Sequence, residues 1–146
     1  MRTYKILFVC VHNSFRSQLA QAIASKRYGS LLSAHSAGLD ATRGINPLAK
    51  SVGLAHGYDL SSHVVTDVFD LYKQGQTFDV VIAVCSKDAY ERCPIFPGVH
   101  KRLHWPLIDP SAPNVKDEDR EILTHQLIHE LEIRLENLVN ELQENR

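Results

Sequence analysis

The chain has 146 residues, 44% of them hydrophobic and 23% charged, and its formal net charge at pH 7 is −1. These values are ordinary for a compact globular protein, so we expect a single domain over residues 1–146. The near-neutral charge argues against nucleic acid as a partner, and no apolar run approaches the roughly 18 residues of a membrane span. The apolar segment near the N-terminus is too short for a signal peptide, and we expect a cytoplasmic monomer.

Short apolar runs alternate with amphipathic stretches, a pattern that predicts strand–helix units around a parallel sheet. The first strand is predicted over residues 5–9, and the first helix over 17–28 with Gly29 as its end. A weaker second strand is expected over residues 31–36. The chain therefore begins with a strand, a helix and a further strand.

Two shorter helices are predicted next. Asn46 and Pro47 have the residue types of an N-cap and a first helical position, and we expect Gly53 to end this helix. A second short helix is expected over residues 67–74, with Gly75 closing it.

The second half of the chain holds the clearest strand, residues 79–84, which is apolar without alternation, as expected when both faces of a sheet are covered. A fourth strand is predicted over 101–105. A long helix over 117–142 carries leucines at spacings of three and four, which favours packing on the sheet over a coiled coil. The whole pattern predicts an α/β fold with a parallel sheet.

Polar and thiol side chains fall where these strands end. Cys10 follows the first strand and Ser36 ends the second. Cys85 follows the third strand, and Asp109 comes shortly after the fourth. Since ligands of open parallel sheets bind outside the carboxyl ends of the strands, we expect these side chains along one edge of the sheet.

The three cysteines, Cys10, Cys85 and Cys93, are an odd number, which argues against a disulfide framework in a reducing compartment. Taken singly, each could be a small buried hydrophobe. The positions of Cys10 and Cys85 at the expected ligand-binding edge favour a chemical role for the thiols instead.

The loop after Cys10 has the residues of an oxyanion site. Its backbone N–H groups and those of the following helical turn can form an anion-binding nest, which also favours a thiolate. Arg16 offers planar paired donors to two oxygens of phosphate or arsenate, and Ser17 is positioned to donate to the sulfur. The residues expected to bind substrate are Val11, His12, Asn13, Ser14, Phe15 and Arg16. Asn13 is the residue type that tolerates a left-handed backbone in such a loop.

Metal binding is the less favoured interpretation of the remaining candidates. A zinc site could be read from Cys85 and Cys93 with His100 and His104, but the two cysteines are separated by more residues than zinc ligands usually are. His125 and His129 are four residues apart on the last helix but lack the glutamate of the protease motif. We therefore assign no metal and no cofactor.

The sequence resembles the low-molecular-weight protein tyrosine phosphatases and, more closely, the thioredoxin-coupled arsenate reductases built on the same fold. The resemblance covers nearly the whole chain. It rests on "FVCVHNSFRSQLA" (8–20), "SAG" (36–38), "GINPLA" (44–49), "VCSKDAYERCP" (84–94) and "HWPLIDP" (104–110). It implies a three-layer sandwich around a central four-stranded parallel sheet.

The resemblance also implies a mechanism. Cys10 would attack arsenate while Asp109 protonates the departing oxygen. Cys85 would then attack the Cys10 sulfur and release arsenite, and Cys93 would attack Cys85. The resulting disulfide would be reduced by thioredoxin or a similar dithiol. For Cys93 to reach Cys85, residues 86–92 are expected to be mobile.

Two other functions remain open. A phosphatase acting on phosphotyrosine or aryl phosphates would use Cys10, Arg16 and Asp109, but Ser111 stands near the place where that branch usually carries a tyrosine. The other function is non-enzymatic, that of a thiol redox sensor or an oxyanion-binding module. Some relatives bind potassium through a glutamate, and Gln21 occupies its position here.

Overall fold

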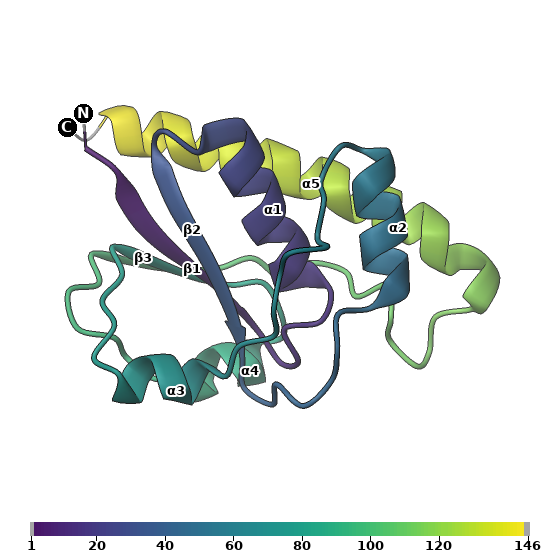
Figure 1. Cartoon of the computed structure of the whole chain (residues 1–146), viewed down its shortest axis with the longest axis horizontal. Coiled ribbons are helices and arrows are strands. Elements are labelled where there is room, and N and C mark those ends of the chain that lie inside the picture. The colour runs from purple at the N-terminus through teal and green to yellow at the C-terminus, as the bar shows by residue number, and fades with distance from the viewer. Residues whose placement is uncertain (1, 145–146) are drawn as a thin grey trace.

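The computed structural model describes residues 2–144, apart from the side chains of residues 88 and 89, and it has three layers with a β-sheet in the middle (Figure 1). The elements in chain order are β1 (Tyr4–Cys10), α1 (Arg16–Tyr28), β2 (Leu32–Gly38), α2 (Pro47–Ala55), α3 (Val68–Lys73), β3 (Val80–Ala83), α4 (Lys87–Arg92), β4 (Lys101–His104) and α5 (Asp117–Glu144).

The sheet has the strand order β2-β1-β3-β4, and each neighbouring pair is parallel. Helices α1, α2 and α5 cover one face, while α3 and α4 lie against the other (Figure 1). Inner strands with helices on both faces bury side chains of either orientation, which explains the unbroken apolar runs in the sequence. The predicted fold is confirmed.

Alternate residues of β1 enter two separate apolar clusters. Ile6 and Phe8 pack in the larger cluster with α1, α2 and α5. Leu7 and Val9 pack in the smaller cluster, which also holds Val68 of α3. The period of two in a strand produces this division, because successive side chains point to opposite faces.

Helix α5 packs its leucine stripe on the sheet and on its neighbouring helices. The buried leucines are Leu127, Leu131, Leu135, Leu138 and Leu142. A coiled coil would need the same stripe for a partner, so that alternative is wrong. At the far end, the hydroxyl of Tyr4 donates to the carbonyl of Leu142 at 3.3 Å, which joins the start of β1 to the last turn of α5.

The predicted end of α2 is wrong. Gly53 lies inside the helix, and the left-handed glycine that follows the helix is Gly57, with φ of +87°. A Cβ at Gly53 would lie 3.1 Å from the Leu19 side chain and 3.1 Å from the Tyr58 carbonyl oxygen. The glycine therefore permits close packing between α2 and α1, and the start of α2 is as predicted, with the Asn46 side chain accepting from Leu48 N at 2.8 Å.

Two further expectations differ from the structure. Strand β2 continues to Gly38, so Ser36 pairs with Phe8 inside the sheet and does not end the strand. Residues 87–92, for which the sequence predicts no regular element, form the short helix α4, and the mobility expected of residues 86–92 stays a prediction.

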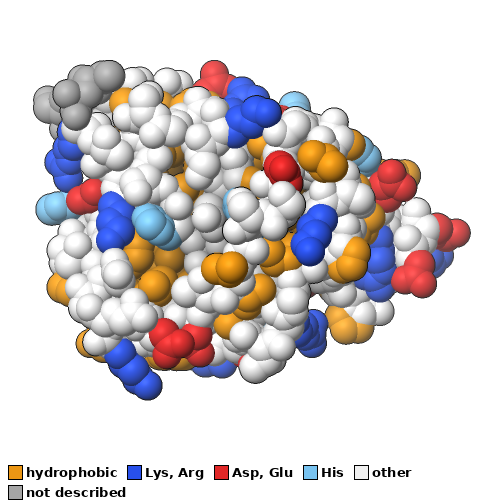
Figure 2. All heavy atoms as spheres, viewed as in Figure 1, with side chains coloured by type: hydrophobic (Ala, Val, Ile, Leu, Met, Phe, Trp, Pro, Cys, Tyr) orange, Lys and Arg blue, Asp and Glu red, His pale blue; other side chains and the backbone are white. Residues whose placement is uncertain are grey.

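The surface is mixed in charge. Figure 2 shows positive and negative side chains interspersed over one face, without a broad area of a single sign. Within residues 2–144, none of the helices combines the length and the apolar character needed to cross a bilayer.

Candidate active site

Cys10 is the last residue of β1, and its side chain is buried at the start of the loop that leads into α1. Its Sγ lies 2.8 Å from Ser17 Oγ and accepts from the backbone N–H of Asn13 at 3.1 Å. Ser17 Oγ itself accepts from Asn13 Nδ2 at 2.8 Å, which leaves the serine hydrogen free to point at the sulfur. Two donors thus converge on the thiol.

The loop curls through a left-handed residue, Asn13, whose φ is 55°. Asparagine adopts this conformation at lower cost than most side chains because its short amide can bond locally. The Asn13 amide oxygen accepts from the backbone N–H of Thr66 at 2.9 Å, so the loop is held by the segment before α3.

Gln18 is a polar residue of the site that the sequence reasoning missed. It is fully buried in the first turn of α1, and its Nε2 lies 3.0 Å from each of Asn13 O, Asn13 Oδ1 and Val64 O. Its Oε1 accepts from His63 Nδ1 at 2.8 Å. Burial lowers the pKa of His63, which keeps the imidazole neutral near pH 7. A polar residue on the buried face of an amphipathic helix was the available signal.

Gly38 supports the loop from the side of β2. A Cβ there would lie 2.8 Å from both Asn13 N and Val11 O, and 2.9 Å from His12 C. These are backbone atoms, so the loop can rest on the end of β2 only because residue 38 has no side chain.

The N-terminus of α1 is open toward the loop. The N-cap residue is Phe15, whose side chain makes no capping hydrogen bond, and the first turn contains no acidic residue. The first N–H groups of a helix lack partners within the helix and carry its positive dipole end. An oxyanion above Cys10 would therefore meet several N–H donors without a competing carboxylate in that turn.

Arg16 and Asp109 approach each other across this opening. Arg16 Nη1 donates to the carbonyl of Leu107 at 3.2 Å, and Arg16 Nη2 lies 3.7 Å from Asp109 Oδ2. Asp109 Oδ1 also accepts from the backbone N–H and the hydroxyl of Ser111, at 2.9 and 2.6 Å. The loop that follows β4 thereby brings a carboxyl group to the edge where β1 ends.

Cys85 is buried next to the end of β1. Its Sγ lies 3.6 Å from the carbonyl oxygen of Val9, the residue before Cys10. Burial raises the pKa of the Cys85 thiol to about 12, the nearby Cys10 and Cys93 sulfurs add to this rise, and Arg16 opposes it. Cys85 is therefore protonated at neutral pH and lies within electrostatic range of both other thiols.

Cys93 lies on the other side of the sheet. It packs in the smaller apolar cluster with Leu7 and Val9, whereas Cys10 and Cys85 belong to the larger one. Burial raises the pKa of the Cys93 thiol, and the Arg102 guanidinium opposes the rise. Helix α4 lies between Cys85 and Cys93 in the chain, and all three thiols are free.

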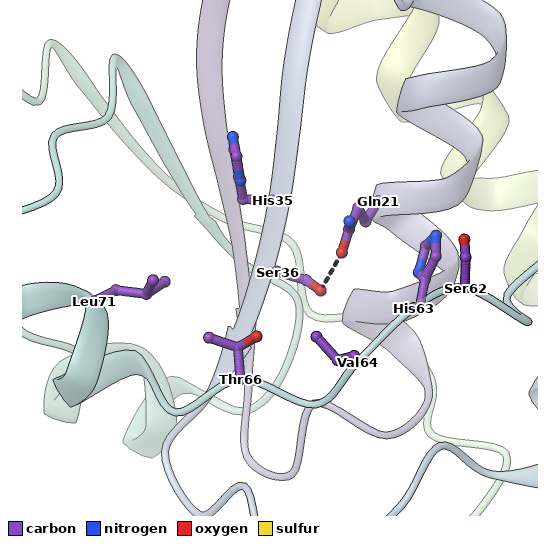
Figure 3. Close-up of a pocket in the computed structure, with 8 residues that line it drawn as sticks. All are labelled: Gln21, His35, Ser36, Ser62, His63, Val64, Thr66 and Leu71. Carbon is purple, nitrogen blue, oxygen red and sulfur yellow. Dashed lines mark hydrogen bonds between the residues drawn. The ribbon is translucent and has the colours of Figure 1, made fainter.

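Ser36 lines a cavity of about 370 Å³ beside the oxyanion loop (Figure 3). Its hydroxyl donates to Gln21 Oε1 at 2.5 Å, which joins β2 to α1 at this cavity. His63 lines the same cavity from the segment before α3. In the part of the chain that the structure describes, no group of three or more His, Cys, Asp and Glu side chains is arranged to hold a metal ion.

The histidines considered above for a metal site have other contacts. His104 Nε2 donates to the carbonyl of Cys85 at 2.6 Å. His125 Nδ1 lies 2.7 Å from His56 Nε2, and His125 Nε2 lies 3.8 Å from Glu121. His125 thus belongs to a surface contact between α5 and the residue that follows α2.

Comparison with known proteins gives concordant matches. The family model for low molecular weight phosphotyrosine protein phosphatase matches residues 5–146. An arsenate reductase of Staphylococcus xylosus is 37% identical over 107 residues, which are 73% of this chain and 79% of that protein.

Solved structures of both reductases and phosphatases share the fold. A thioredoxin-dependent arsenate reductase of Corynebacterium glutamicum matches with a TM-score of 0.74 and 28% identity over 99% of this chain. The match covers 64% of that protein, so this chain spans less than two thirds of its length. A protein tyrosine phosphatase from Entamoeba histolytica, in a product state mimic, matches with a TM-score of 0.77 and 25% identity over 99% of this chain and 98% of its own.

Proposed function

Since the chain belongs to the low molecular weight phosphotyrosine protein phosphatase family, we propose that its loop binds a tetrahedral oxyanion and that the protein reduces arsenate to arsenite. In this proposal Cys10, Cys85 and Cys93 act in succession and a thioredoxin-type dithiol restores them. The Staphylococcus xylosus relative is named an arsenate reductase, and the Corynebacterium glutamicum structure is named a thioredoxin-dependent arsenate reductase. Both names support the proposal.

The first step uses the oxyanion loop, whose backbone N–H groups from Val11 to Phe15 would hold the arsenate oxygens together with Arg16. The Cys10 thiolate, stabilised by Ser17 and Asn13 N–H, attacks arsenic and forms a sulfur–arsenic bond. One arsenate oxygen leaves as water, with a proton supplied by Asp109. Arsenic remains in the +5 state in this adduct.

The second step transfers two electrons. The Cys85 sulfur attacks the Cys10 sulfur as its thiol proton passes to an oxygen of the departing arsenic group, and a sulfur–sulfur bond forms as the sulfur–arsenic bond breaks. The electron pair of the broken bond goes to arsenic, which leaves as arsenite in the +3 state. The two thiols supply the two electrons and become the Cys10–Cys85 disulfide.

The third step frees the nucleophile. The Cys93 sulfur attacks the Cys85 sulfur as its thiol proton passes to water, and the Cys10 thiolate is the leaving group. The Cys85–Cys93 disulfide then accepts two electrons from the external dithiol, which is itself oxidised to a disulfide. Cys93 must move for this step, because it packs in the cluster on the opposite face from Cys10.

The observation that carries the proposal is the position of Cys85. Its sulfur lies 3.6 Å from the carbonyl of the residue before Cys10, and both other thiols are near enough to raise its pKa. Phosphate ester hydrolysis requires no second thiol at this place, whereas a two-electron reduction requires one.

Phosphatase activity is the second candidate function. Arg16 and Asp109 lie 3.7 Å apart beside the loop, an arrangement that could bind a phosphoryl group and protonate a leaving alcohol. The Entamoeba histolytica phosphatase of similar fold supports this candidate.

The decisive experiment measures arsenate-dependent oxidation of NADPH in the presence of thioredoxin and thioredoxin reductase. Wild-type protein is expected to turn over, and Cys10→Ser, Cys85→Ser and Cys93→Ser are each expected to lose multiple turnover. Hydrolysis of p-nitrophenyl phosphate by the same variants serves as the matched control. Only Cys10→Ser should lose that reaction, since Cys85 and Cys93 have no part in it.

Two outcomes would contradict the proposal. If Cys93→Ser cycles at the wild-type rate, the third step is wrong. If wild-type protein hydrolyses the aryl phosphate but produces no arsenite, the protein is a phosphatase and its two further thiols serve another purpose.

A further inference from the structure

We propose that Arg102 and His104 of β4, together with Tyr90 of α4, form a latch that holds α4 closed and limits how often Cys93 can leave its buried position. The effect of this latch on the third step rests on the proposed function. The latch itself acts in the reduced protein and needs no substrate.

The three side chains contact one another directly. Arg102 and His104 are two residues apart on β4, so they lie on the same face of the sheet. The Arg102 guanidinium carbon lies 4.7 Å from the centroid of the Tyr90 ring. The His104 ring stacks on Tyr90 with a centroid distance of 5.2 Å and an interplanar angle of 21°. A cation and an aromatic ring of one strand thus hold a single side chain of α4.

The same two residues of β4 also bind the backbone on both sides of α4. Arg102 Nη2 donates to the carbonyls of Tyr90 and Cys93, at 3.0 and 3.3 Å. His104 Nε2 donates to the carbonyl of Cys85 at 2.6 Å. One strand therefore fixes the two cysteines and the helix that separates them.

Helix α4 depends on these contacts because it has only six residues. A helix so short does not persist by its own hydrogen bonds, and the carbonyls of its last turn need partners outside it. Arg102 provides partners for two carbonyls at that end. When Cys93 moves toward Cys85, the Tyr90 ring and the Cys93 carbonyl must leave Arg102 first.

The opening can be measured without arsenate by alkylation of the reduced protein. Iodoacetamide is added under native conditions, and labelling of each cysteine is followed by peptide mass spectrometry. We expect Tyr90→Leu to label Cys93 about tenfold faster than wild type, because the variant loses one cation–π and one stacking contact. Tyr90→Phe keeps the ring and should label Cys93 at the wild-type rate.

A matched control is Tyr28→Leu, a half-buried tyrosine at the end of α1, which should leave the labelling of Cys93 unchanged. Cys10 serves as an internal control, since general unfolding would expose it as well. The proposal is overturned if Tyr90→Leu labels Cys93 at the wild-type rate, if Tyr90→Phe labels as fast as Tyr90→Leu, or if Cys10 and Cys93 accelerate together.

A single-turnover experiment with arsenate then tests the catalytic consequence. Tyr90→Leu should form the Cys85–Cys93 disulfide faster than wild type and the Cys10–Cys85 disulfide at the same rate. If arsenate oxidises none of the thiols, the proposed function fails, while the labelling comparison still decides whether the latch exists. Equal rates of Cys85–Cys93 formation in wild type and Tyr90→Leu would contradict the catalytic role of the latch.

Discussion

Gly38 determines how closely the oxyanion loop lies on the sheet. We predict that Gly38→Ala displaces the loop, because the new methyl group would fall 2.8 Å from two backbone atoms of the loop. Overpacking of this kind costs about 1–3 kcal/mol. Urea unfolding should show that loss, and calorimetric titration should show weaker binding of phosphate.

Gly44→Ala is the control for this prediction, since a Cβ at Gly44 meets nothing within 4 Å. It should leave both the unfolding midpoint and the phosphate affinity unchanged. Wild-type stability and affinity in Gly38→Ala would show that the loop tolerates a side chain there.

The raised pKa of Cys85 makes stability depend on pH in a defined direction. The folded protein holds the thiol proton up to about pH 12, whereas an unfolded thiol loses it near pH 8.5. The folded state therefore binds more protons between these values, and the contribution of Cys85 to stability is complete below about pH 8.5 and is lost as the pH rises toward 12.

The measurement compares wild type with Cys85→Ala by urea unfolding in reducing buffer from pH 7 to 10. The free energy of unfolding of wild type should fall relative to the variant by up to about 1.4 kcal/mol per pH unit above pH 8.5. A difference between the two proteins that stays constant over this range would contradict the prediction.

Part of the site could be predicted from local sequence alone. Cys10, Arg16 and Ser17 lie within one strand–loop–helix segment, so their spacing and the parallel sheet suffice to bring them together. Gln18 and Gly38 were not predicted, because their contacts depend on which distant segments meet the loop. The position of Cys93 on the opposite face depends in the same way on how α4 folds.

The N-cap residue of helix α2, Asn46, also binds the oxyanion loop. The Asn46 side chain accepts from Leu48 N, and the Asn46 backbone N–H donates to the carbonyl of Ser14 at 2.9 Å. We predict that Asn46→Ala lowers the free energy of unfolding by about 1 kcal/mol through loss of the cap. Asn46→Ser keeps a capping oxygen and should stay near wild type, and thermal unfolding monitored by circular dichroism would separate the two. Equal melting temperatures would show that the cap contributes nothing.

Elements with strong local signals were predicted well, and those that depend on tertiary contacts were not. The cap at Asn46 and the apolar run of β3 are local signals, and both elements begin where expected or within one residue. Helix α4 is short and polar, and it is supported by Arg102 of β4, which contacts the ring and the carbonyl of Tyr90. A search for hydrophobic periodicity does not detect such a contact. The same reason explains the misplaced end of α2, where Gly53 serves packing against α1.

At the scale of the whole molecule, α5 covers the core with one stripe of its surface. We predict that Leu131→Ala costs about 2–5 kcal/mol, because Leu131 is fully buried in the larger cluster. Ile133→Ala is the matched control, since Ile133 lies on the same helix with 43% of its surface exposed. Urea unfolding of the two variants measures the difference. If α5 instead paired with a second copy of the chain in a coiled coil, the urea unfolding midpoint of wild type would depend on protein concentration. We expect the same unfolding midpoint at all protein concentrations.

The hydrogen bond between Tyr4 and Leu142 has a practical consequence for handling the protein. It brings the first strand and the final helical turn together at the amino end of the sheet, about 20 Å along β1 from the thiol of Cys10. A dye, an affinity handle or an electrode linker attached near either of these residues would leave the mouth above the reactive sulfur unobstructed. Electron delivery to an immobilised sample could then be followed while soluble oxyanions and reductants exchange freely.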